Sequence, residues 1–166
     1  MDRATLEKIV HAKLRVLKHL PQEGDLSLVV LKGHLLIEEL LVILVESSVK
    51  YPEALRSANL RFHTLASIAK ALFYTETTSF IWDGIFALNV LRNAFAHNLQ
   101  PRDLDDKINQ LGRAWPGGNR ESEKDAVSIP KSEIGGIIEF MCGSLMGLLA
   151  STALKDDSDR PTAIAG

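Results

Sequence analysis

Three polar residues, Asn89, Asn93 and His97, recur at four-residue spacing in the second half of the chain. A helix advances about 100° per residue, so this spacing places the three side chains in one polar stripe. Apolar residues occupy most of the neighbouring positions, so we expect the stripe to meet a partner or line a cleft. Arg92 lies off this face, but its long side chain can curve back toward His97.

These residue types suit the chemistry of phosphodiesters. An imidazole can accept and donate protons near neutral pH, and a guanidinium can bind a phosphate through two parallel hydrogen bonds. Such a reaction requires neither a metal ion nor another cofactor. The sequence therefore predicts a candidate site around Arg92, Asn93 and His97, with Asn89 in support.

Other histidines are weaker candidates. His34 and Glu38 stand four residues apart in a long apolar stretch and could support the site from across a bundle, although a buried hydrogen-bonded pair is the commoner outcome. His11, His19 and His63 are scattered, which favours surface or packing positions for them. No metal site is predicted.

The elements that must position these residues are helices. Apolar residues recur at helical spacing, and the sustained alternation typical of strands is missing, which predicts an all-α fold. Main helices are expected at about residues 4–20, 26–49, 60–73 and 79–98, with short helical segments at 51–56 and 103–111 and a last helix beginning near Pro130 and Ser132. The first helix should carry an apolar stripe of Leu6, Ile9, Val10, Leu14 and Leu17.

This pattern predicts an antiparallel up-and-down bundle of four to five main helices, with the polar stripe near the C-terminal end of the fourth. The 166 residues are 46% hydrophobic, enough for one domain, which we expect over residues 1–155 with a disordered tail at 156–166. The Gly-rich, charged stretch at 113–128 is expected to be a mobile loop that folding does not require.

Charge and cysteine content narrow the classes of function. The formal net charge of −2 excludes a global basic field, so any contact with RNA must be local. The single cysteine, Cys142, cannot form an intramolecular disulfide and has no cysteine partner for a metal, which favours the cytoplasm. The apolar stretch at 134–154 approaches the length of a membrane span, but glycines and hydroxyl residues dilute it, so we expect a core helix and no membrane.

The segment Leu91–Asn98, LRNAFAHN, resembles the Arg-polar-x-x-x-His signature of the HEPN family, whose members are antiparallel helical bundles. A looser similarity extends over residues 26–99. The resemblance implies a metal-independent endoribonuclease, a toxin or defence effector, that acts as a homodimer with a shared cleft. By position, His97 would be the acid/base residue, Arg92 would bind the phosphate, and Asn93 would orient the substrate. RNA and an antitoxin or regulatory protein would be its partners.

Other interpretations of the same residues remain open. Arg92 could pair with Glu38 or Glu39, His97 could cap its own helix, and Asn93 could bond across a dimer interface. The HEPN family also includes noncatalytic members, among them proteins like the mannitol operon repressor. A homodimer is expected on either interpretation, because the fourth helix combines an apolar surface with the polar stripe.

Overall fold

Helices make up most of the part of the chain that the computed structural model describes, residues 3–21, 24–98, 101–113 and 129–158. They are α1 (Arg3–His19), α2 (Leu26–Glu46), α3 (Pro52–Ser57), α4 (Phe62–Phe73), α5 (Ser79–His97), α6 (Leu104–Arg113) and α7 (Ile134–Ser158). Short 3-10 turns, η1 (Glu76–Thr78) and η2 (Lys131–Glu133), precede α5 and α7. No strand occurs within these ranges, which confirms the predicted all-α class.

Local sequence accounts for several helix ends. The Asp25 side chain caps α2 by accepting a hydrogen bond from the backbone N–H of Ser27, at 2.8 Å. Pro52 occupies the first turn of α3, where the missing N–H costs nothing. Thr75 and Thr78 form a reciprocal capping box just before α5. These ends fix where α2 and α5 begin, and therefore which of their residues lie opposite each other.

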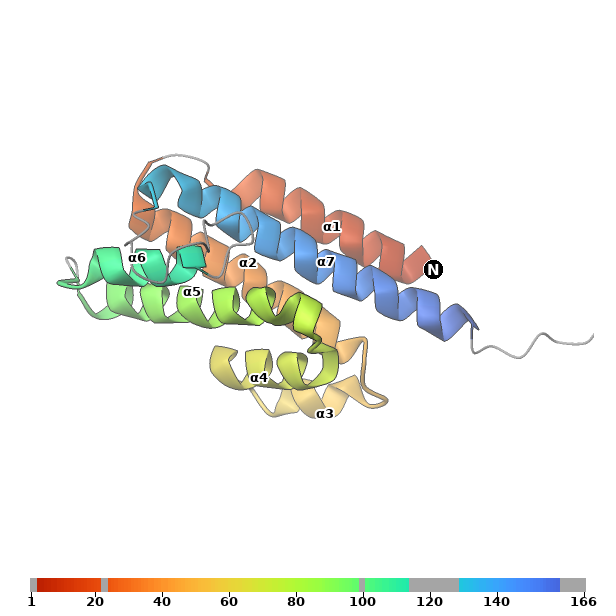
Figure 1. Cartoon of the computed structure of the whole chain (residues 1–166). Coiled ribbons are helices and arrows are strands. Elements are labelled where there is room, and N and C mark those ends of the chain that lie inside the picture. Colours follow the sequence, from red (N-terminus) through yellow and green to blue (C-terminus); the bar gives the residue numbers. More distant parts are fainter. Residues whose placement is uncertain (1–2, 22–23, 99–100, 114–128, 159–166) are drawn as a thin grey trace, which may run out of the picture.

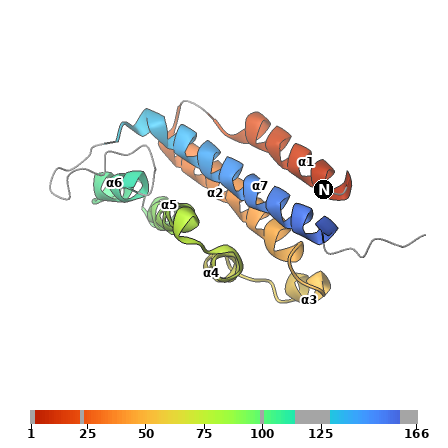
Figure 2. The same cartoon turned by 45° about the vertical axis from the view of Figure 1, so that its right-hand side comes forward.

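The main helices pack side by side as an antiparallel bundle (Figure 1). α2 and α7 run in one direction, and α1 and α5 run in the other. α2 is central, since it contacts α1, α4, α5 and α7. α6 packs along α5, and the turned view shows α1 on the opposite side of the bundle from α4 and α5 (Figure 2).

The core is filled by aliphatic side chains of α2, α5 and α7 together with the Trp82 ring, which is completely buried. Gly33 of α2 is also buried, and a Cβ placed there would stand 2.7 Å from two atoms of Ile138 on α7. Carbon atoms in favourable contact are about 3.5–4.0 Å apart. The absence of a side chain at Gly33 therefore lets α2 and α7 approach closely.

The apolar stripe expected on α1 proves to be mostly exposed. Leu6, Val10, Leu14 and Leu17 are 46%, 47%, 57% and 60% exposed, whereas Ile9 packs partly against the core. The buried face consists instead of Ala12, Val16 and Leu20. α1 thus has two apolar arcs. The arc of Ala12, Val16 and Leu20, which includes a small alanine, packs against α7 and α2.

α7 carries the apolar stretch noted in the sequence. Residues 131–152 are long and apolar enough to cross a membrane by length and composition, but 44% of the most apolar window is buried inside the bundle. Gly136, Gly143 and Gly147 face open space, while Ile138, Cys142 and Leu145 pack inside. α7 therefore contributes one face to the core of the bundle and exposes the other.

Two expectations fall largely on residues outside the described ranges. They are the loop at 113–128, of which the structure describes Arg113 at the end of α6, and the tail, of which it describes the backbone of residues 156–158. α7 continues to Ser158, three residues beyond the expected end of the domain at 155.

Candidate functional site

Polar side chains meet where α2 and α5 pack together. We call this contact region the α2–α5 seam and define it by His34, Asn89, Arg92 and Asn93. The Nε2 atom of His34 lies 3.2 Å from the Oδ1 atom of Asn89. Because an amide oxygen can only accept, this contact requires the imidazole tautomer in which Nε2 donates. The His34 ring also stacks on Phe62 of α4, with 3.9 Å between the ring centroids. His34 is thus held from two helices.

The electrostatic surroundings of His34 favour its neutral form. Burial lowers the pKa of His34 below its ordinary value, the hydrogen bond to Asn89 opposes this shift, and the nearby charge of Arg92 lowers the pKa further. The imidazole is 5% exposed, so the cost of charging it is substantial. His34 therefore serves as a neutral hydrogen-bond donor that fixes Asn89.

Arg92 and Asn93 form the second polar pair of the α2–α5 seam. The Nη1 atom of Arg92 donates to Oδ1 of Asn93 at 3.1 Å, and both side chains are half-buried. A guanidinium has five N–H donors, so Arg92 keeps donors for a phosphate. Among the described residues Arg92 forms no ion pair. It is a cation held in place but not neutralised.

The alternative in which Arg92 pairs with Glu38 or Glu39 does not occur among the ion pairs of the described residues. Glu39 accepts from Nη2 of Arg15 on α1, at 2.7 Å, instead of pairing with Arg92. Glu38 is half-buried one turn along α2 from His34, but His34 bonds to Asn89 on the other helix. Of the residues proposed as support, His34 and Asn89 come together and Glu38 does not join them.

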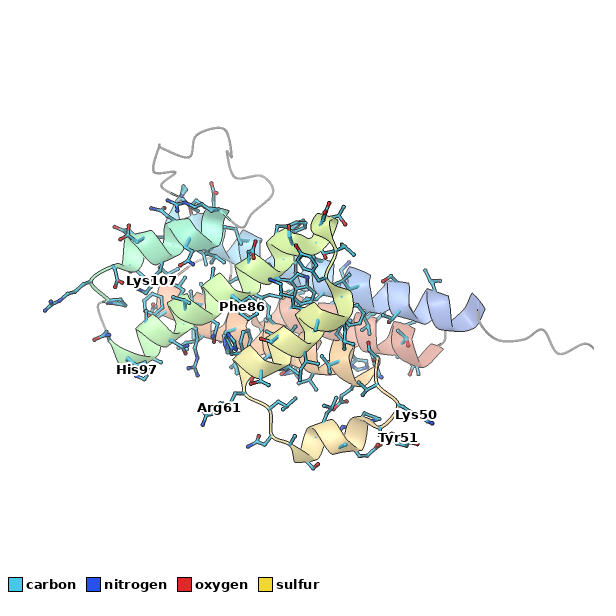
Figure 3. All side chains as sticks on the ribbon, turned by 60° about the horizontal axis from the view of Figure 1, so that its bottom comes forward. Lys50, Tyr51, Arg61, Phe86, His97 and Lys107 are labelled. Carbon is cyan, nitrogen blue, oxygen red and sulfur yellow. The ribbon has the colours of Figure 1, made fainter. Side chains whose placement is uncertain are left out.

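His97 lies in the last turn of α5, exposed at the edge of the molecule (Figure 3). Residues four apart on an α-helix differ by about 40° in direction, so the stripe rotates as it advances. Asn89 consequently points into the α2–α5 seam, Asn93 is half-buried, and His97 is exposed. The structure therefore brings four predicted residues together and places His97 at their open end.

α4 covers one part of this region. It lies beneath the N-terminal part of α5, while the C-terminal part that carries the motif extends beyond it (Figure 1). On α2, exposed leucines occupy the corresponding end: Leu28, Leu31 and Leu35 are 44%, 37% and 57% exposed. Their spacing of three and four residues places them on one face of α2. Polar site residues thus lie next to an uncovered apolar face.

A separate groove of about 410 Å³ runs between α1 and α2. Its lining includes His11, Leu36 and Leu40, together with the ion-paired Arg15 and Glu39. The groove contains none of the predicted site residues, and the ion pair across it joins α1 to α2. We assign it a structural role.

Sequence reasoning missed two sets of residues. Phe62 supports His34, a contact that depends on how α4 packs and has no signal in the local sequence. His63 and Lys70 of α4 gather around Phe86 of α5, where the ring of His63 lies 5.2 Å and the Lys70 ammonium 5.7 Å from the Phe86 centroid. The seven-residue spacing of His63 and Lys70, which places both on one helix face, was the available signal.

The cysteine and the two tryptophans of the chain lie in the core or outside the described ranges. Cys142 is buried, and burial raises the pKa of its thiol to about 12, as expected for an inert cysteine. Trp82 is a core residue whose Nε1 atom has no hydrogen-bond partner among the described residues, and Trp115 lies outside them. Within those residues, no three His, Cys, Asp or Glu side chains form a group that could hold a metal.

Comparison with protein-family models, curated proteins and solved structures finds no match to this chain.

Proposed function

We propose that the chain is a metal-independent endoribonuclease of the HEPN type that acts as a homodimer. The observation that carries the proposal is that Arg92, held by Asn93, forms no ion pair with a carboxylate of the described residues, while His97 is exposed five residues further along α5. This pairing of a phosphate-binding cation with a proton-transferring imidazole is what transesterification of RNA requires.

In the proposed reaction the 2′-hydroxyl of a ribose attacks the adjacent phosphorus. A bond from the 2′-oxygen to phosphorus forms, the bond from phosphorus to the 5′-oxygen breaks, and a 2′,3′-cyclic phosphate remains. His97 accepts the proton that the 2′-hydroxyl loses and returns a proton to the departing 5′-oxygen, while Arg92 stabilises the negative charge on the phosphate. Asn93 holds the guanidinium of Arg92 and can orient the substrate.

A second copy of the chain is the proposed partner at this site. Leu28, Leu31 and Leu35 expose apolar surface beside the α2–α5 seam, and about one third to three fifths of each residue is accessible. Pairing of two such faces would bury these leucines and bring two copies of Arg92 and His97 to one cleft. The proposed setting is the cytoplasm, where an antitoxin or other regulatory protein would be a further partner.

The experiment is cleavage of mixed RNA in the presence of EDTA, with the product ends analysed for cyclic phosphate. His97→Ala should lower the rate about 100- to 10,000-fold, the usual contribution of general acid–base catalysis. Arg92→Lys should lower it about 100-fold, because an ammonium cannot make the planar two-point contact of a guanidinium. Circular dichroism should show unchanged helicity in both variants.

Matched controls are His11→Ala on α1 and Arg113→Lys at the end of α6, which should cleave like the wild type. Cleavage at the wild-type rate by His97→Ala would refute the proposal.

A noncatalytic regulator, of the kind that the mannitol operon repressor exemplifies, is the second candidate. One observation favours it: His34 and Asn89 bond to each other inside the bundle, a contact that can serve to fix the register of α2 against α5. This function gains support if the wild type cuts no RNA and the Arg92 and His97 variants instead lose dimerisation or binding of a partner protein.

A further inference from the structure

A second polar surface extends from the candidate site across α4 and α5. We call it the α4–α5 strip and define it by Arg61, His63, Lys70, Tyr74 and Phe86. Phe86 lies at its centre, half-buried against the hydrophobic core, in contact with the His63 ring and beneath the Lys70 ammonium. The same ammonium lies 5.4 Å from the centroid of the Tyr74 ring. Cations and aromatic rings therefore alternate along this surface.

The α4–α5 strip is continuous with the edge where His97 lies. Phe86, Asn93 and His97 follow one another at spacings of seven and four residues, which places them along one side of α5. The distance from Phe86 to His97 along the helix axis is about 16 Å. Figure 3 shows Arg61, Phe86 and His97 on the same side of the molecule, the side that α4 and α5 form.

Its charge differs from that of the whole chain. The formal net charge is −2, yet Arg61 and Lys70 give the strip two permanent cations, and His63 adds an ionisable ring. The carboxylates nearest these residues in sequence are Asp83, one turn before Phe86 on α5, and Glu76, two residues after Tyr74. An anion would therefore be attracted locally at Arg61 and Lys70, whereas the chain as a whole is mildly acidic.

We propose that the α4–α5 strip binds single-stranded RNA and leads it to His97, an inference that rests on the ribonuclease function proposed above. Bases stack on Phe86 and Tyr74, and phosphates contact Lys70 and Arg61. Stacking on side-chain rings requires bases that are free of a duplex, which is why the expected ligand is single-stranded. Lys70 positions Phe86 and Tyr74 and keeps N–H donors for a phosphate.

The test measures binding separately from cleavage. The probe is a fluorescent, single-stranded 2′-O-methyl RNA of mixed sequence, which lacks the hydroxyl that the proposed cleavage needs, and affinity is measured by anisotropy at several salt concentrations. Phe86→Leu keeps an apolar side chain but removes the ring, and it should weaken binding about tenfold. Lys70→Gln should reduce the slope of log affinity against log salt by about 0.7, the value for one phosphate contact with a single strand.

The chain supplies a matched control in Lys50, whose ammonium lies 5.3 Å from the centroid of the Tyr51 ring. This pair repeats the Lys70 chemistry at a different part of the surface (Figure 3). Lys50→Gln should leave both affinity and salt slope unchanged. Equal effects of the Lys50 and Lys70 variants would overturn the proposal, and so would equal affinity of the wild type for duplex and single-stranded probes.

The outcomes also separate this inference from the proposed function. If the protein cleaves natural RNA but the Lys70 and Phe86 variants bind the probe like the wild type, RNA binding by the α4–α5 strip is overturned and the proposed nuclease function stands. Binding that depends on both residues, in a protein that cuts no RNA, supports the strip and overturns the nuclease. Absence of any binding to the probe overturns the strip.

Discussion

The close approach of α2 and α7 gives the sharpest prediction about the fold that positions the site. In Gly33→Ala the new Cβ would stand 2.7 Å from both Cδ1 and Cγ2 of Ile138, so one of the two helices or the Ile138 side chain must move by roughly 1 Å to reach ordinary contact. Overpacking of this kind costs about 1–3 kcal/mol. Alanine in a helix interior regains about 1 kcal/mol over glycine. We expect a net loss of about 1 kcal/mol in the free energy of unfolding.

Gly143→Ala is the matched control, because a Cβ at that position of α7 meets no atom of the described residues within 4 Å. Helix propensity should then act alone and raise the free energy of unfolding by about 1 kcal/mol. For a domain of this size, each kcal/mol corresponds to a change of about 2–4 °C in Tm. The two variants should therefore differ by about 4–8 °C in a thermal melt followed by circular dichroism.

A double mutant tests the cause of the loss. Ile138→Val removes Cδ1, one of the two atoms that the new Cβ would meet, and alone it should cost about 1 kcal/mol. In the Gly33→Ala background the same change should cost less, because it relieves the overlap. If Gly33→Ala raises Tm as much as Gly143→Ala does, the described packing of α2 on α7 is wrong.

The remaining predictions concern a buried histidine, a buried thiol and the proposed dimer. The pKa of His34 is lower in the folded chain than its ordinary 6.5, so the free energy of unfolding should fall as the pH decreases from 6.5 through the folded-state pKa. His34→Gln should reduce this loss. Urea titrations at pH 7 and pH 5 measure it in both proteins. Cys142, with a pKa of about 12, should react with a thiol reagent only as fast as the protein unfolds, and rapid labelling of folded protein would contradict its burial. Leu35→Asp should convert the dimer to a monomer in sedimentation experiments. Leu14→Asp, at an equally exposed position on α1, should leave the dimer intact. A wild type that stays monomeric at high micromolar concentration would contradict the proposal that two chains share the site.

Helix boundaries were predictable where residues with a fixed backbone preference occur. Pro52 marks the start of α3, and α1 ends shortly before Pro21. The end of α2 came three residues earlier than expected, at Glu46 instead of 49. There the hydroxyls of Ser47 and Ser48 donate to the carbonyls of Ile43 and Leu44 and so compete with backbone N–H groups for these acceptors. The spacing of apolar residues does not reveal this competition.

The buried face of α1 was not predictable from periodicity. Leu6 and Leu14 belong to an apolar arc as regular as the one formed by Ala12 and Val16, and the larger side chains suggested the wrong arc. Which arc is buried depends on how closely α7 and α2 approach α1, and that distance is a property of the assembled bundle.

The candidate site was predictable as a stripe but not as an arrangement. Four-residue spacing correctly grouped Asn89, Asn93 and His97 on neighbouring parts of α5. The rotation of about 40° per step then divided them between the α2–α5 seam and solvent. The partner of Asn89 was beyond reach, because the contact with His34 joins residues 55 positions apart in the chain.

The small buried face of α1 has a consequence for the motions of the molecule. Its buried face offers little apolar surface, and the exposed leucines opposite that face lose nothing when the helix detaches. α1 should therefore open as a cooperative unit at a free energy well below that of global unfolding, while α2 stays folded. Amide hydrogens of α1 would exchange with deuterated water earlier than those of α2, and transient detachment would uncover the side of α7 on which α1 packs.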